Sequence, residues 1–169
     1  MLLLLPAVQY YSFAGDYSLG GFNSPRGFGL SVDYALGDDI RNSYSVFAET
    51  YGIFGGKYDV PGLKGMFLHY NRLASLDMEF SVLDLFFAPG GSIGWVRDNA
   101  SGDRFGLCTS VDFAIASLLR FDRGISIEFG FVVEAGLFSR PSGNGVRISM
   151  YHNGVMQAYY PHIKLMFNL

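Results

Sequence analysis

The chain has 169 residues, of which 50% are hydrophobic, 17% are aromatic and 16% are charged, and its net charge is −3. This composition excludes extensive disorder, because disordered chains are polar and poor in aromatic residues. A bundle of transmembrane helices is also excluded, because the apolar segment at residues 1–8 is far shorter than the ~20 residues that cross a bilayer. With 12 basic and 15 acidic side chains, the chain has no positive surplus for binding nucleic acid.

A single domain is expected over residues 1–169, because this length is typical of one folding unit. The single cysteine, Cys108, excludes an internal disulfide and any CxxC motif, and a low cysteine content suits an oxidising compartment. Residues 1–8 resemble the apolar part of a secretory signal but have no preceding basic residue and no clear small-x-small cleavage site. We therefore expect them to belong to the mature chain, with any export signal upstream.

Apolar residues alternate with small or polar residues along much of the chain. Successive side chains of a strand point to opposite faces, so this period of two predicts β-strands. The alternation is clearest at residues 28–36, 105–115, 125–137 and 159–169. Turn-like breaks divide the chain into eight expected strands, at residues 2–14, 26–36, 43–54, 64–72, 76–96, 103–120, 125–139 and 158–169.

The expected connections alternate in length. The longer ones are residues 15–25, 55–62, 97–102 and 140–157, and the shorter ones are 37–42, 72–75 and 122–124. Single-chain bacterial barrels have an even number of strands, with short periplasmic turns and longer outer loops. We therefore expect both termini in the periplasm and closure by pairing of 2–14 with 158–169. Residues 146–151 are too short to span, and we expect a small hairpin there, turned at Asn153-Gly154.

The expected strand at residues 76–96 is irregular. Met78, Phe80 and Val82 share one parity, whereas Leu83, Leu85 and Phe87 take the other. A change of parity within one strand requires an extra residue, so we expect a β-bulge near Val82–Leu83.

The two faces of the strands distinguish a soluble barrel from a membrane barrel. A soluble barrel covers its outer face with charged residues, but here the second face carries Gly, Ala and Ser with a few carboxylates, which suit a narrow lumen. The strands at 104–119 and 125–139 also exceed the ~9–11 residues that cross a bilayer when tilted. The sequence therefore predicts an all-β, eight-stranded antiparallel up-and-down transmembrane β-barrel, with a soluble ligand-binding barrel as the alternative. The residues expected to face lipid include Val111, Phe113, Ile115, Phe129, Phe131 and Val133.

The last expected strand, residues 159–169, looks like the C-terminal signal by which outer-membrane proteins are recognised for insertion, although it ends on Leu169 rather than on an aromatic residue. With this strand and the alternation before it, the chain resembles the small eight-stranded outer-membrane β-barrel proteins of Gram-negative bacteria, the OmpA/OmpX/OmpW-like group. The resemblance implies a place in the bacterial outer membrane, in contact with its lipid and lipopolysaccharide.

Polar residues on the small-residue face are expected to fill the lumen, because eight strands leave just enough room for side chains. The residues expected to point inward are Asp33, Glu49, Asp84, Asp112, Glu128, Glu134, His162 and Lys164, together with His69 and Cys108. Buried charges must pair or hydrogen-bond, so a plug of ion pairs is the favoured interpretation. A narrow cation or proton pathway is the alternative, since acids outnumber bases in this set.

Amphipathic aromatic side chains settle at membrane interfaces. Those expected near the outer rim are Trp95, Phe105 and Tyr159, and those expected near the inner rim are Tyr34, Tyr70 and Phe167.

The sequence contains no catalytic, cofactor-binding or metal-binding motif. The three histidines, His69, His152 and His162, lack the spacing of a metal site. A nucleophile and base near the outer rim could come only from Ser142 or Ser149 with His152 and Asp103, which no common spacing connects. We therefore expect a non-enzymatic barrel that is a structural or accessory subunit of a larger outer-membrane complex, with another outer-membrane protein as partner. The alternatives are a narrow channel or ligand carrier with an acidic lumen, and a lipid-modifying barrel enzyme.

Overall fold

The computed structural model describes residues 16–24, 27–49, 62–98, 104–121, 124–151 and 159–169. These residues form one antiparallel sheet of nine strands, and none of them forms a helix that could cross a membrane. The strands are β1 (Asp16–Ser24), β2 (Gly27–Leu36), β3 (Ile40–Glu49), β4 (Gly62–Met78), β5 (Ser81–Asp98), β6 (Arg104–Phe121), β7 (Ile125–Ser142), β8 (Gly145–Tyr151) and β9 (Tyr159–Asn168).

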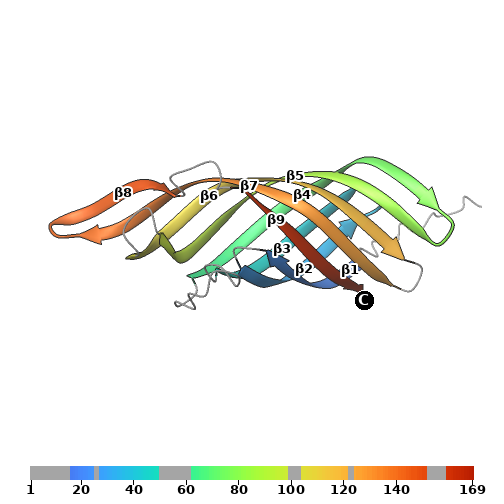
Figure 1. Ribbon diagram of the computed structural model, residues 1–169, viewed down its shortest axis with the longest axis horizontal. Coiled ribbons are helices and arrows are strands. Elements are labelled where there is room, and N and C mark those ends of the chain that lie inside the picture. Colours follow the sequence, from blue (N-terminus) through green and yellow to red (C-terminus); the bar gives the residue numbers. More distant parts are fainter. Residues whose placement is uncertain (1–15, 25–26, 50–61, 99–103, 122–123, 152–158) are drawn as a thin grey trace, which may run out of the picture.

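Eight of these strands pair in a closed ring (Figure 1). Strands β1 to β7 pair in chain order, and β9 closes the ring by pairing with both β7 and β1. Within the described residues β8 pairs with the last part of β7 alone, and the β7–β8 hairpin extends beyond the ring. The predicted all-β antiparallel fold is therefore confirmed, with a ninth strand outside the ring of eight.

The short connections lie at one end of the ring. The turns at residues 37–39 and 79–80, and Gly124 just before β7, are at the end where β1 begins and β9 finishes. There the Leu169 amide donates to the Tyr17 carbonyl at 2.8 Å. Gly37 and Gly124 adopt φ values of 70° and 73°, which favour glycine. We call this end the turn rim, and the end where β1 passes to β2, β3 to β4 and β5 to β6 the loop rim.

The first strand differs from the prediction. Strand β1 occupies residues 16–24, which the sequence analysis assigned to an outer loop, and it is β1 that pairs with β9, from Ser18 opposite Asn168 to Asn23 opposite Ile163. The predicted closure through residues 2–14 is therefore wrong, and those residues lie outside the described part of the chain. Two adjacent glycines and an Asn-Ser-Pro run gave this segment the composition of a loop, which masked its alternation.

Strand β4 also runs further than predicted. It continues through residues 72–75, the site of a predicted turn, to Met78, and the chain reverses at Glu79-Phe80. The irregularity lies in β4, where the register shifts between Arg72 and Ala74, and β5 is regular across Val82–Leu83. The predicted positions of the turn and of the bulge are therefore wrong. Glu79-Phe80 has none of the Asn-Gly or Gly-X chemistry that identifies a two-residue hairpin turn.

Strand β8 confirms the expected short strand in the last connection, but its turn is different. The hairpin reverses at Gly143-Asn144, where Gly143 has a φ of 44°, and β8 pairs back onto β7. The predicted turn at Asn153-Gly154 lies outside the described residues. The other predicted strands, at 26–36, 43–54, 103–120, 125–139 and 158–169, overlap β2, β3, β6, β7 and β9.

The two faces of the ring are opposite in character. Large apolar side chains on the outer face are exposed, for example Phe131 at 43% and Val111 at 54%, whereas Asp112, Glu128 and Glu134 on the inner face are almost completely buried. Val133, Phe129, Phe113 and Ile115 are also exposed on the outer face. The predicted inward and outward directions of β6 and β7 are therefore confirmed.

Candidate functional site

Glu128 is the centre of a buried polar cluster inside the ring. Its carboxylate accepts hydrogen bonds from the Arg41 guanidinium and from the Tyr70 hydroxyl, the latter at 2.9 Å. His162 Nε2 lies 2.8 Å from the same carboxylate, and since an ionised carboxylate can only accept, Nε2 carries the hydrogen. Arg41 also lies over the Tyr70 ring, 4.0 Å from its centroid. These contacts join β3 and β4 to β7 and β9 across the ring.

Lys164 extends this cluster along β9. Its Nζ donates to Asp33 at 2.6 Å and to the Ser43 hydroxyl at 3.0 Å, and the Ser31 hydroxyl donates to Asp33 at 2.9 Å. Two basic side chains therefore face two carboxylates, and this pairing offsets the cost of burying the charges. We call this set the lower cluster; its members are Asp33, Arg41, Tyr70, Glu128, His162 and Lys164.

A second polar cluster lies nearer the loop rim. Lys64 Nζ donates to Glu134 at 2.5 Å, and both side chains are buried. Asp112 lies directly opposite Glu134 across the β6–β7 ladder and accepts from the Ser110 hydroxyl at 2.8 Å. The Ser92 and Ser110 hydroxyls also share a hydrogen bond. This upper cluster of Lys64, Asp112 and Glu134 places two carboxylates against one ammonium.

An apolar layer separates the two clusters. On β4, Met66 and Leu68 lie between Lys64 and Tyr70, and on β7 Val132 lies between the two glutamates. The Phe22 and Phe47 rings stack in the same layer, with centroids 5.4 Å apart. A cavity of about 10 Å³ remains beside this layer, which is close to the smallest space that holds one water molecule. The interior at this layer is therefore packed rather than open.

At the turn rim a further network crosses the inner face. Asp84 lies 2.7 Å from Arg120 and 3.6 Å from Arg72. The β2–β3 turn contributes to it through Asp38, 3.4 Å from Arg120, and through Asp39, 2.6 Å from Arg72. This network connects the turn to β4, β5 and β6.

The structure places most of the predicted lumen residues on the inner face. Buried there are Asp33, Asp84, Cys108, Asp112, Glu128, Glu134, His162 and Lys164. The side chain of Glu49, at the end of β3, lies outside the described part. The inward prediction is wrong for His69, which shares its parity with the exposed Phe67 and lies 2.7 Å from Asn42 on the outer face.

The predicted interfacial aromatic residues differ in their exposure. Trp95 and Phe167 are exposed on the outer face, Phe105 and Tyr34 are half-buried, and the side chain of Tyr159 lies outside the described part. Tyr70 is the exception: it is buried, points inward and donates to Glu128, so the interfacial prediction is wrong for it. Its parity along β4 is that of Lys64 and Leu68, both of which are buried.

Apart from Lys164, the cations that neutralise these acids were not predicted from the sequence. Arg41 and Arg72 fell within predicted turns, so no facing was assigned to them, and Arg120 stood at the end of a predicted strand. Lys64 could have been found, because it alternates with Met66, Leu68 and Tyr70 on one face of β4.

The candidate catalytic residues lie only partly within the described residues. Ser142 and Ser149 lie on the β7–β8 hairpin, whereas His152 and Asp103 lie outside the described residues. Among the described residues, no group of three or more His, Cys, Asp or Glu side chains is arranged to hold a metal ion.

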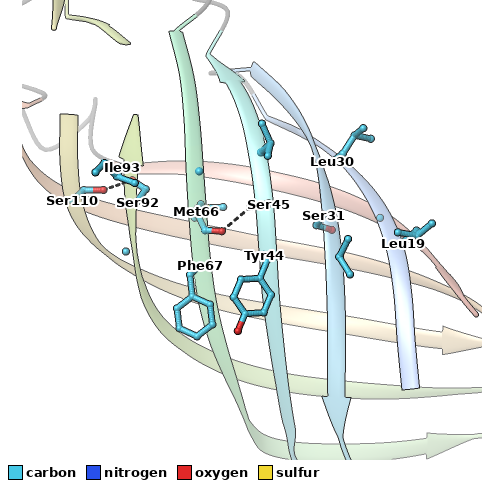
Figure 2. A pocket seen from close by; sticks show the side chains of 15 residues that line it. Leu19, Leu30, Ser31, Tyr44, Ser45, Met66, Phe67, Ser92, Ile93 and Ser110 are labelled. Atoms are coloured by element: carbon cyan, nitrogen blue, oxygen red, sulfur yellow. Dashed lines mark hydrogen bonds between the residues drawn. The ribbon is translucent and has the colours of Figure 1, made fainter. Parts of the chain in front are cut away.

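Among the described residues, the outer face has an apolar groove of about 990 Å³ across β1 to β6 (Figure 2). Its floor includes Gly65 and Gly91, and its walls include the Tyr44 and Phe67 rings, whose centroids lie 5.1 Å apart. The other lining residues are Leu19, Gly20, Leu30, Ser31, Val32, Ser45, Val46, Met66, Ser92, Ile93 and Ser110. We call this concavity the outer groove.

Comparison of the chain with protein-family models, with curated proteins and with solved structures found no match.

Proposed function

We propose that this protein is an integral β-barrel of the bacterial outer membrane, without an open pore and without catalytic activity, which acts as a structural or accessory subunit of a larger envelope complex. The observation that supports this proposal is the inverted arrangement of the ring. Its buried interior carries the ion pairs of the lower and upper clusters, and its exposed outer face carries apolar side chains on every strand of the ring.

Water is a poor solvent for such an outer face. Soluble monomers rarely expose contiguous apolar patches larger than a few hundred Å², whereas a membrane barrel needs an apolar outer band and tolerates a polar interior. Strands β1, β2, β3 and β9 have 9 or 10 residues, the length that crosses a bilayer when tilted. A membrane therefore accounts for both faces at once.

The packed interior favours a structural role over transport. The lower cluster is balanced in charge, and the apolar layer of Phe22, Phe47, Met66, Leu68 and Val132 separates it from the upper cluster. An ion moving through the described interior would have to break the Lys64–Glu134 or Arg41–Glu128 pair and displace this layer. Barrels of eight strands are generally filled by side chains.

The outer groove supports the accessory role. Gly65 has open space above it, since an added Cβ would meet only the Ile93 carbonyl oxygen, at 3.9 Å. A floor of glycine lets a partner's side chains approach the backbone closely, as small residues do between helices in membranes. A larger barrel could therefore seat an apolar ridge in this groove.

Capture from mild detergent tests the proposal. Tagged wild-type protein should co-purify with a larger envelope protein, and Gly65→Phe, which fills the groove, should lose that protein. Ala135→Phe is the matched control, because Ala135 is exposed on the outer face of β7, away from the groove. Solubility without detergent would overturn the membrane assignment. A lone monomer that conducts in planar bilayers would replace the accessory role with that of a channel.

A further inference from the structure

The β7–β8 hairpin is a charged, amphipathic extension of the ring. Arg140 lies directly opposite Arg147 across the hairpin, so both side chains point to the same face. Like charges directly opposite one another in a sheet destabilise it. Residues 136–151 contain no acidic residue, although the whole chain has a net charge of −3. The hairpin therefore concentrates positive charge at one end of the molecule.

The other face of the hairpin is apolar and exposed. Val146, Ile148 and Met150 are exposed by 69%, 67% and 66%, respectively. Met150 lies opposite Leu137, which is itself exposed on the outer face of β7. The apolar row of the hairpin therefore continues the apolar wall of the ring past the loop rim.

The extension at the opposite end of the molecule has the reverse charge. Figure 1 shows the β4–β5 hairpin at the turn rim and the β7–β8 hairpin at the far end of the long axis. The β4–β5 hairpin also exposes apolar side chains, such as Met78, but it carries Asp77 and Glu79, and residues 73–86 contain no basic residue. The difference between the two hairpins is therefore one of charge and not of hydrophobicity.

From this pattern we propose that the β7–β8 hairpin docks on an anionic lipid surface, with its apolar row in the acyl boundary and Arg140 and Arg147 on the phosphates of the headgroups. This inference rests on the proposed membrane barrel. Apolar and basic faces back to back are the arrangement by which amphipathic elements bind anionic membrane surfaces. Arginine matches phosphate oxygens with two parallel N–H donors, and its long side chain can reach the interface from the far face of a thin ribbon.

Quenching by brominated acyl chains tests the docking. Each reporter is a single tryptophan in a Trp95→Phe background, and the protein is reconstituted in brominated phosphatidylcholine vesicles with or without phosphatidylglycerol. Ile148→Trp should be quenched more strongly when the anionic lipid is present and less strongly in high salt. Replacing Arg140 and Arg147 by glutamine should remove that increase, and each arginine lost should shift the docking equilibrium by about fivefold.

Two further tryptophan reporters distinguish a failure of the docking inference from a failure of the proposed membrane barrel. Met78→Trp, on the acidic hairpin, should show no increase with the anionic lipid. Val111→Trp, on the wall of the ring, should be quenched in both kinds of vesicle, including in the arginine double variant, which shows that this variant is folded and inserted. Equal quenching of Ile148→Trp with and without anionic lipid would overturn the docking inference alone. An unquenched Val111→Trp would overturn the membrane barrel, and the docking inference with it.

Discussion

Glu128 has more charged and polar partners than any other side chain of the lower cluster. Arg41, Tyr70 and His162 all direct hydrogens to its carboxylate, and none of the four side chains is appreciably exposed. In such a cluster the loss of one charge leaves its partner buried and uncompensated, which costs more than the pair itself contributes.

Replacing Glu128 by Gln should therefore lower the free energy of unfolding by about 3 kcal/mol or more, because Arg41 would stay buried without its counter-charge. The measurement is urea unfolding of the protein reconstituted in vesicles. Ser126→Ala is the control, since Ser126 lies on the same face of β7 and is also buried, and it should cost less than about 1 kcal/mol. Equal losses for the two variants would contradict the role assigned to Glu128.

In the upper cluster, removing the charge of Asp112 should have the opposite effect on stability. Asp112 and Glu134 face each other directly, and Lys64 donates to Glu134. Like charges in direct opposition are destabilising. Asp112→Asn should therefore raise the free energy of unfolding by up to about 1 kcal/mol, measured by the same urea titration. Glu134→Gln, which removes the carboxylate that pairs with Lys64, should lower the free energy of unfolding. A loss of stability in Asp112→Asn would show that its charge is needed.

At the scale of elements, the bulge in β4 adds one residue to the strand. The numbering of the inward-pointing residues shifts by one at the bulge, and the same face of the strand points inward before and after it. Arg72 pairs with Phe86 and Ala74 with Leu85, so Leu73 is the extra residue. Elsewhere in a strand, a slip by one residue moves every following side chain to the other face of the sheet.

Deleting Leu73 should therefore be tolerated, because Arg72 and Ala74 would follow each other in a regular ladder with unchanged facing. Deleting Phe67, in the regular part of β4, should prevent folding, because Lys64 would then point outward, away from Glu134. Protease resistance after reconstitution distinguishes a folded ring from an unfolded chain. Resistance in both deletion variants would contradict the register of β4.

Long strands with clear alternation could be predicted from the sequence, whereas short or interrupted ones could not. Strands β6 and β7 begin at or within one residue of their predicted starts, because a long run of one alternating pattern, at residues 105–115 and 125–137, outweighs local composition. Strand β1 was missed because its glycines resemble a loop. The alternation predicted which way the buried acidic side chains point, but it did not predict their partners. Arg41 and Glu128 are 87 residues apart in the sequence, and only the closed ring brings them together.

At the scale of the whole molecule, one charged substitution on the outer face tests whether that face contacts lipid or water. Phe131 is exposed on the outer face of β7, at a position about halfway along its pairing with β6. Phe131→Arg should cost about 2–4 kcal/mol if this position lies near the middle of a bilayer, whereas an exposed arginine in water should cost little. Urea unfolding from vesicles measures this loss, and Phe131→Leu is the control. A neutral Phe131→Arg would contradict the membrane assignment.

The two ends of the ring differ, so labelling a residue at each end tests the orientation of the protein in the membrane. Bacterial outer-membrane barrels place short turns in the periplasm. If the proposed function holds, the turn rim with Asp77 faces the periplasm and the β7–β8 turn at Asn144 faces the outside of the cell. In a Cys108→Ala background, a membrane-impermeant maleimide applied to intact Gram-negative cells should label Asn144→Cys and leave Asp77→Cys unlabelled until the outer membrane is permeabilised. Cys108 is buried beside Val96 and Phe138, so its replacement by alanine keeps an apolar contact there. Labelling of Asp77→Cys alone on intact cells would reverse the orientation and would place the basic hairpin in the periplasm, away from the outer leaflet.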